Sequence, residues 1–248
     1  MTIFRNTLTI VAAAFAIGLA SCGGTAKAGG SDVFTTQSGK RVEFTFIKHG
    51  SLEIKYDSLY IQVDPVSQLP PVTDYSRFHK ADIILITHEH YDHYDEAAID
   101  MLCDSTTRIV LNGRCAAMLR RGTALANGNS LQLRSDITID AVPAYNTTPA
   151  HTKFHPKGRD NGYVLTLDGF RIYIAGDTED IPELKNLQNI DVAFLPCNQP
   201  YTMTLDQFVN AVKAFSPRVV YPYHYNDTQV SRLPAMLKGC DVRIRPMK

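Results

Sequence analysis

One short stretch constrains this chain more than any other: an apolar run at residues 83–86 leads directly into Thr-His-Glu-His-Tyr-Asp-His. Side chains alternate between faces in an extended segment, so His88 and His90 point to the same side and can share one metal ion. Asp92 and His93 lie just beyond, where the chain turns toward a predicted helix, and can face a second ion. With 8 histidines in 248 residues, an H-x-H-x-D-H pattern arises by chance roughly 0.0006 times per chain. The spacing therefore predicts a metal site and not an incidental histidine-rich loop.

The rest of the chain contains many short strand-like runs and a few helical ones. Runs rich in β-branched and aromatic residues predict strands at 42–48, 52–56, 59–63, 83–86, 108–111, 137–142, 163–167, 171–175, 192–195, 219–223 and 242–244. Apolar periodicity predicts helices at 96–103, 114–120, 182–187, 205–215 and 230–237. In the longest helix, Thr204 is a plausible N-cap and Pro217 follows the end. A strand-rich first half followed by alternating strands and helices, with no repeat period, predicts an α/β (α+β) fold of two mixed β-sheets covered by helices.

Composition indicates one globular domain and excludes several classes of protein. The 44% hydrophobic content is enough for a sizeable core, which excludes collagen, coiled coils and wholesale disorder. Lys and Arg number 25 against 25 Asp and Glu, so no basic surface is predicted and nucleic acid is excluded as a partner. No long Gly-, Ser- or Pro-rich tract after residue 40 divides the chain.

The N-terminus has the features of a targeting segment. Arg5 precedes an apolar run at residues 8–20, which is long enough for a signal peptide but short for a membrane span. Leu19-Ala20-Ser21-Cys22 resembles the lipobox of bacterial lipoproteins, so we expect Cys22 to be lipidated and to anchor the protein on the periplasmic or cell-surface side of a membrane. The alternative is a plain secretory signal with an incidental cysteine. The expected organisation is a signal peptide at 1–21, a flexible tether at 22–34 and the folded domain at 35–248.

The remaining cysteines form no CxxC pair, which favours free thiols: Cys103, Cys115, Cys197 and Cys240.

The histidine-rich stretch resembles the signature of the metallo-β-lactamase-fold hydrolase superfamily, and the resemblance covers nearly all of the chain after residue 40. Within that superfamily the chain is most similar to metal-dependent hydrolases related to the L-ascorbate-6-phosphate lactonase and N-acylphosphatidylethanolamine phospholipase D groups. The other segments that carry the resemblance are Lys48-His49-Gly50-Ser51, Val63-Asp64-Pro65, Ala144-Tyr145-Asn146, Phe154-His155-Pro156-Lys157-Gly158, Ala175-Gly176-Asp177-Thr178, Leu195-Pro196-Cys197-Asn198 and Tyr223-His224-Tyr225. The resemblance implies an αββα four-layer sandwich with the site on loops at one edge of the sheets.

Carried over by position, the resemblance implies a dinuclear site. His88, His90 and a later histidine would hold the first ion, and the others would serve the second or bridge the two: Asp92, His93 and His224 at the second ion and Asp177 between them. Imidazole and carboxylate donors suit zinc first, manganese second, and also iron.

Two histidines compete for the third position at the first ion. We favour His155, because Phe154-His155-Pro156-Lys157-Gly158 resembles the closer relatives and because Pro156 restricts His155 to extended backbone. His151 is the alternative, since Pro149-Ala150-His151-Thr152 resembles the P-G-H-T of many superfamily members.

Five further residues are candidates to support a ligand or to contact the substrate: His49, Asp64, Asn198, Tyr201 and Tyr225. Asp64 either accepts a hydrogen bond from a ligand histidine or caps a turn, and the sequence leaves both open. His49 has either a substrate-side role or that of an exposed turn histidine.

These residues predict a hydrolase. Two cations that share a carboxylate lower the pKa of a bridging water enough to present hydroxide near neutral pH, with Asp92 and Asp177 as the catalytic carboxylates. The absence of a G-x-S-x-G motif agrees with a mechanism that needs no protein nucleophile. We expect an ester, lactone or phosphodiester bond in a small-molecule or lipid substrate. The alternatives are a non-catalytic metal-binding surface lipoprotein and a diiron redox protein on the same fold, although flavodiiron relatives use Glu where this chain has His90.

Overall fold

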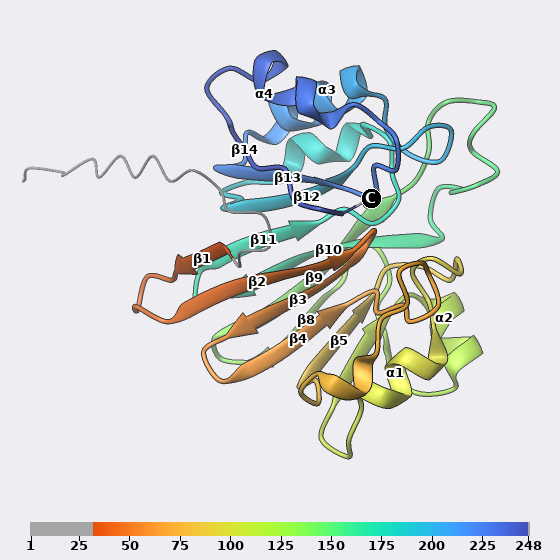
Figure 1. The fold of residues 1–248 in the computed structure, drawn as a ribbon, viewed down its shortest axis with the longest axis vertical. Coiled ribbons are helices and arrows are strands. Elements are labelled where there is room, and N and C mark those ends of the chain that lie inside the picture. The colour runs from red at the N-terminus through yellow and green to blue at the C-terminus, as the bar shows by residue number, and fades with distance from the viewer. Residues whose placement is uncertain (1–31, 248) are drawn as a thin grey trace, which may run out of the picture. The chain divides into compact units, whose positions relative to one another are not determined.

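The computed structural model describes residues 32–247, and its strands form two seven-stranded sheets (Figure 1). The first sheet has the order β1 to β7: Asp32–Thr35, Arg41–Lys48, Ser51–Tyr56, Leu59–Val63, Ile83–Ile86, Arg108–Leu111 and Thr123–Ala124. Neighbours from β1 to β4 are antiparallel, and β5, β6 and β7 are added in parallel. The tight turns after β2 and β3 place His49 and Asp57 at φ 48° and 55°, the left-handed region that short turns require.

The second sheet repeats this connectivity. Its order is β8 to β14: Ser130–Arg134, Ile137–Ala144, Asp160–Leu167, Phe170–Ile174, Val192–Pro196, Val219–Tyr223 and Asp241–Val242. Neighbours from β8 to β11 are antiparallel, and β12, β13 and β14 are again added in parallel. Each half of the chain therefore ends its parallel strands at one edge, where loops can converge on a common site.

Helices cover the outer faces of both sheets (Figure 1). On the first sheet, α1 (Glu96–Leu102), α2 (Gly113–Leu119) and the 3-10 turn η1 (Tyr75–Arg77) pack with one face of β5 and β6 in a shared apolar cluster. On the second sheet lie α3 (Leu205–Phe215), α4 (Leu233–Met236) and the 3-10 segments η2 (Pro182–Asn186) and η3 (Val230–Arg232). Strand β5 is apolar at every position because it is buried on both faces.

The longest helix, α3, begins and ends where its sequence signals place it. Thr204 accepts a hydrogen bond from the Gln207 amide, and the Gln207 side chain accepts one from the Thr204 amide, which forms a capping box. Ser216 ends the helix in a left-handed conformation. Phe208, Val212 and Phe215 face the sheet and are buried.

Aromatic rings fill the space between the two sheets. Phe194 of β12 is fully buried, stacks on Tyr221 of β13 with ring centroids 5.1 Å apart, and meets Phe44 of β2 edge-on at 5.3 Å. Because Phe44 belongs to the first sheet, these contacts join the two halves directly.

The predicted fold class is confirmed, with two mixed sheets flanked by helices. Several details differ from the expectations, among them the predicted helix at 182–187, which is the 3-10 segment η2. Strand β1 starts at Asp32, before the expected domain start at residue 35, because Phe34 packs against Phe44 and Phe170. The predicted helix at 230–237 is instead η3 followed by α4, since Pro234 has no amide hydrogen to continue a helix across the junction. The predictions missed β7 and β8, which lie at the edges of the two sheets, and the side chains of β8 alternate between exposed and half-buried.

All four cysteines in the described part of the chain are free thiols, of which Cys115 and Cys197 are buried and Cys103 and Cys240 are half-buried. Cys22 and the apolar run at residues 8–20 lie outside the described residues. Within residues 32–247, no helix has the length and apolar character that crossing a membrane requires.

The aromatic contact between the sheets yields a stability prediction. We expect Phe194→Ala to lower the free energy of unfolding by about 3–5 kcal/mol, because it removes a fully buried ring and leaves a cavity. Phe194→Leu should lower it by about 1 kcal/mol. Urea unfolding followed by circular dichroism measures both. The control Val33→Ala changes an exposed side chain and should shift stability by less than about 0.5 kcal/mol; equal losses in Phe194→Ala and Val33→Ala would contradict the core assignment.

Candidate metal centre

The predicted ligands come from both halves of the chain and meet at one edge of the sheets. His88 and His90 follow β5, and Asp92 and His93 lie in the same loop before α1. The second half supplies three more residues from three separate loops: His155 before β10, Asp177 after β11 and His224 after β13. The fold thus brings together residues that are up to 136 positions apart in the sequence, from 88 to 224.

A first group consists of His88, His90, His155 and Asp177, whose donor atoms all lie within 4.8 Å of one another. His88, His155 and Asp177 are buried and His90 is half-buried. Its composition of three imidazoles and one carboxylate is a set of donors that suits a transition-metal cation.

A second group consists of His49, Asp92, His93 and His224, within the same 4.8 Å limit. The prediction placed three of these at a second ion and left His49 as either a site residue or an exposed turn residue. His49 is only 8% exposed, its Nε2 lies 3.1 Å from Asp92 Oδ2, and its ring lies 3.7 Å from that of His224. It therefore belongs to the site.

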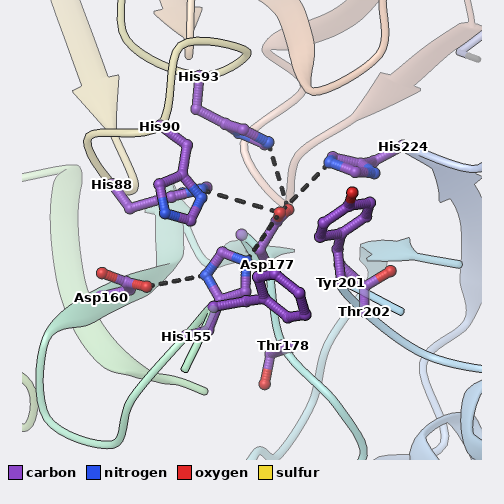
Figure 2. A network of polar contacts seen from close by, with 12 residues as sticks. His88, His90, His93, His155, Asp160, Asp177, Thr178, Tyr201, Thr202 and His224 are labelled. Atoms are coloured by element: carbon purple, nitrogen blue, oxygen red, sulfur yellow. Dashed lines mark hydrogen bonds and ion pairs between the residues drawn. The ribbon is translucent and has the colours of Figure 1, made fainter. Parts of the chain in front are cut away.

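Asp177 joins the two groups (Figure 2). Its Oδ2 lies 3.3 Å from His155 Nε2 and 3.8 Å from His88 Nε2, both in the first group. Its Oδ1 lies 3.3 Å from His93 Nε2, and its Oδ2 is also 3.3 Å from His224 Nε2, both in the second group. One carboxylate thus faces imidazoles of both groups, which is the position of a shared ligand.

The buried donors in this centre fit a cation. The Nε2 atoms of His88, His93, His155 and His224 are buried and have no hydrogen-bond partner, and neither has Asp177 Oδ1. Unpaired buried polar atoms are destabilising unless something else satisfies them. Several nitrogen and oxygen donors that converge on one space are satisfied together by divalent metal ions.

Carboxylates hold the far sides of two of these imidazoles. Asp64 Oδ2 lies 2.8 Å from His93 Nδ1, while Thr87 donates to both Asp64 oxygens through its amide and hydroxyl. Of the two roles that the sequence left open for Asp64, the contact with His93 agrees with the hydrogen bond to a candidate ligand histidine. Asp160, which the sequence did not identify, lies 2.9 Å from His155 Nδ1. Such contacts fix the tautomer that leaves Nε2 free to bind a metal.

The electrostatics of the centre favour cations. Burial raises the pKa of Asp177, but the neighbouring imidazoles of His224 and His93 outweigh it and hold that pKa well below the usual range. Burial also lowers the pKa of His88 and His90, which keeps both imidazoles neutral. The His224 pKa is raised to about 9 although burial lowers it, because Asp177 and Asp92 face the ring. Asp177 is therefore in the ionised form that binds metals, whereas a cation bound by His224 would displace the proton that the raised pKa leaves on this ring.

Two glycines allow the close packing around these ligands. A Cβ at Gly50 would lie 2.6 Å from His93 Cε1, and one at Gly176 would lie 2.8 Å from the Asn161 carbonyl oxygen. Gly176 also has φ 62°, a conformation that favours glycine immediately before Asp177. The segments Lys48-His49-Gly50-Ser51 and Ala175-Gly176-Asp177-Thr178 contain these glycines, but local sequence does not indicate which atoms the glycines approach.

The structure places His151 outside both groups. Its Nδ1 lies 3.2 Å from Oε1 of Glu179, a fully buried carboxylate two residues after Asp177. The other oxygen of Glu179 accepts hydrogen bonds from Thr147 and Thr148. His151 and Glu179 thus fix the loop that carries His155, and this arrangement supports the preference for His155 as the third donor.

A cavity of about 740 Å³ opens onto the centre. Asn198 and Tyr201, two of the candidates for substrate contacts, line it. Tyr225 does not, because its hydroxyl donates to the Arg245 carbonyl, and the expectation for Tyr225 is corrected on this ground. The sequence missed Arg159, which also lines the cavity and donates to Asp160 at 2.7 Å.

Comparison with known proteins finds relatives of this chain among metal-dependent hydrolases. Residues 43–224 match a sequence family described as the beta-lactamase superfamily domain. A UPF0173 metal-dependent hydrolase of Thermococcus onnurineus is 33% identical over 194 residues, which cover 75% of this chain and 85% of that protein. The crystal structure described as a metal-dependent hydrolase from Parabacteroides distasonis has a TM-score of 0.86 and 55% identity, covering 88% of this chain and 99% of that one. A metallo hydrolase of Ignicoccus hospitalis has a TM-score of 0.71 and 25% identity, covering 84% and 96%.

The positions of the two competing histidines yield a prediction. We expect His155→Ala to lower affinity for zinc by more than the roughly 10- to 100-fold that loss of a supporting residue causes. His151→Ala should lower it by about 10-fold at most, because His151 acts only through Glu179. Zinc content after dialysis against a defined free concentration of the metal measures both, and thermal unfolding controls for folding. Loss of zinc in His151→Ala with retention in His155→Ala would reverse the assignment.

Proposed function

The chain belongs to the metallo-β-lactamase superfamily and is a metal-dependent hydrolase, and we propose that it works with two divalent cations held side by side. The single observation that carries this proposal is the position of Asp177, whose carboxylate faces imidazoles of both donor groups at 3.3 to 3.8 Å. His88, His90 and His155 would hold the first cation, Asp92, His93 and His224 would hold the second, and Asp177 would serve both. Zinc is the first candidate by donor type, followed by manganese and iron.

Bound divalent cations would supply an activated water near neutral pH and a positive charge for the oxyanion that develops on the substrate. The chain's own residues fix where this chemistry occurs. Asp64 and Asp160 hold two of the imidazoles in place, so the donor set is preorganised before a substrate enters. His49 Nε2 lies 3.1 Å from Asp92 Oδ2, and this contact fixes the orientation of the Asp92 carboxylate within the second group.

The cavity determines what reaches the centre. Asn198, at 8% exposure, lines it with Asp177 and His224 and is positioned to contact the part of the substrate next to the scissile bond, whereas Tyr201, at 44% exposure, lies at the mouth. We propose a small-molecule substrate with an ester, lactone or phosphodiester bond, since each develops negative charge on an oxygen during hydrolysis.

The experiment that tests this function combines metal content with hydrolysis. The full chain, loaded with zinc or manganese, should hold two ions, and Asp177→Ala should lose most of both because the shared carboxylate is gone. We expect at least one of a set of nitrophenyl esters, lactones and nitrophenyl phosphodiesters to be hydrolysed, with kcat/KM lowered roughly 100- to 1,000-fold or more in Asp177→Ala. Asp206→Asn, an exposed acid at the start of α3, is the matched control and should change neither quantity.

Two outcomes would contradict the proposal. One ion per chain with full hydrolytic activity would exclude the dinuclear arrangement. Two ions with no hydrolysis of any of these substrates would favour the non-catalytic metal-binding alternative.

We also propose that the protein is an exported lipoprotein anchored through Cys22. The support comes from the sequence alone: an apolar run at residues 8–20 ends at Leu19-Ala20-Ser21-Cys22. Strand β1 begins at Asp32, so only a short stretch separates the proposed anchor from the folded domain.

Cys22→Ser tests this anchor. We expect the wild-type chain in the membrane fraction with a lipid-modified N-terminal Cys22, and the variant to leave that fraction because no acyl group can be attached. Mass spectrometry of the N-terminus and fractionation of cells measure the two effects, and Cys103→Ser is a matched control at a half-buried thiol. An unmodified N-terminus, or cleavage at another position, would argue against lipidation.

A further inference from the structure

Exposed large apolar side chains gather at the mouth of the cavity. Within residues 32–247 the most exposed of them are Val33, Val72, Tyr91, Met118 and Tyr201, at 44 to 78% exposure. Three of these five, Tyr91, Met118 and Tyr201, line the cavity. Val72 lies two residues after Pro70, which also lines it. Val33 alone lies elsewhere, in β1.

Six apolar residues line the cavity, and we call them the apolar rim: Leu69, Pro70, Tyr91, Met118, Phe154 and Tyr201. They come from five separate segments, namely the loop after β4, the loop after β5, helix α2, the loop before β10 and the loop after β12. Phe154 and Tyr201 meet edge-on with ring centroids 4.9 Å apart. Because no single amphipathic element explains this clustering, the rim indicates a binding surface for an apolar group.

The cationic side chains at the same mouth already have partners. Arg114 Nε lies 3.1 Å from Glu89 Oε1, and Arg159 is paired with Asp160 at 2.7 Å and Glu89 at 3.5 Å. Lys48 donates to three backbone carbonyl oxygens, those of Ser67, Leu69 and Pro71. Each of these cationic groups therefore already has a carboxylate or carbonyl partner within the protein. The apolar rim is what remains for a ligand to cover.

Lys48 also fixes part of the rim. Its ammonium group is anchored to the loop at both sides of Pro70, which holds Leu69 and Pro70 at the cavity wall. The rim is therefore held in place before any ligand arrives, which lowers the entropic cost of binding.

We infer that the substrate carries an apolar acyl or aryl group, which lies on the apolar rim while the scissile bond reaches the metal donors at the cavity floor. The inference rests on the proposed hydrolytic function and names its substrate class. The cavity runs from Tyr91 and Met118 at the mouth to His155, Asp177 and His224 at the floor, so one ligand can contact both. Its volume of about 740 Å³ accommodates such a group together with a polar head.

The test measures binding separately from catalysis, with straight-chain carboxylates of four to ten carbons as probes. Each is the acid product of an ester, so its carboxylate can occupy the floor and its chain can lie on the rim. Calorimetric titration of the zinc-loaded full chain should show affinity rising about two- to three-fold per methylene, somewhat less than the full burial of each group would give. Affinity that does not change with chain length in the wild-type protein would overturn the inference.

Substitutions assign the effect to the rim. The double variant Met118→Ala with Tyr201→Ala should bind butanoate nearly as the wild type does but lose most of the gain from longer chains, with zinc content unchanged. Tyr201→Phe keeps the ring and should keep the gain, and Val33→Ala is the matched control for an exposed apolar residue away from the cavity. A gain that persists in the double variant would show that the rim is not the chain-binding surface.

Two further results separate the explanations. Light scattering that shows a dimer in the wild type and a monomer in the double variant would mean that the rim is a self-association surface, which would overturn the inference. Chain-length-dependent binding without hydrolysis of any ester would preserve the apolar-ligand assignment while the proposed function fails. Hydrolysis with no dependence on acyl length in either kcat/KM or binding would support the proposed function and overturn the apolar-ligand assignment.

Discussion

The carboxylate of Asp177, surrounded by buried imidazoles from both halves of the chain, is the interaction on which the rest of the site depends. An ionised carboxylate in a buried position is tolerated only with compensating charge, and here His93, His155 and His224 lie 3.3 Å from its oxygens. These side chains come from loops at one edge of two different sheets. The positions of the donors therefore depend on how the two sheets pack against each other. The contact between the rings of Phe194 and Phe44 is part of that packing.

A second set of carboxylates contacts the histidines and fixes the orientation of their rings. Asp64 and Asp160 each orient one imidazole, and Glu179 holds the loop between Thr147 and His155 through four polar contacts. Because Glu179 follows Asp177 by two residues, the same short segment supplies the shared donor and anchors the loop that brings His155. The His151 contact is part of this anchoring, which explains why a histidine so near the site is not in either donor group.

The cavity above the centre combines two kinds of surface. Its charged residues satisfy one another or backbone carbonyls, whereas its large apolar residues are exposed. In a superfamily fold whose chemistry is set by the metal donors, this difference is the feature of the present chain that bears on substrate choice, because loops around a common site set specificity.

The sequence by itself determined the fold class and the local donors. The run from Ile83 to His93 encodes a buried strand and four donors within a few residues, so spacing alone identified a metal site. Contacts between distant segments were decided only by the tertiary structure. It brought His49 into the second group, gave Asp160 and Glu179 their supporting roles, removed Tyr225 from the cavity and chose His155 over His151 for the first group. It also showed the shared connectivity of the two sheets, which no repeat in the sequence had revealed. The physical reason is that alternation and helical periodicity act over a few residues, whereas the position of a side chain relative to a cavity depends on how loops from both sheets pack against one another.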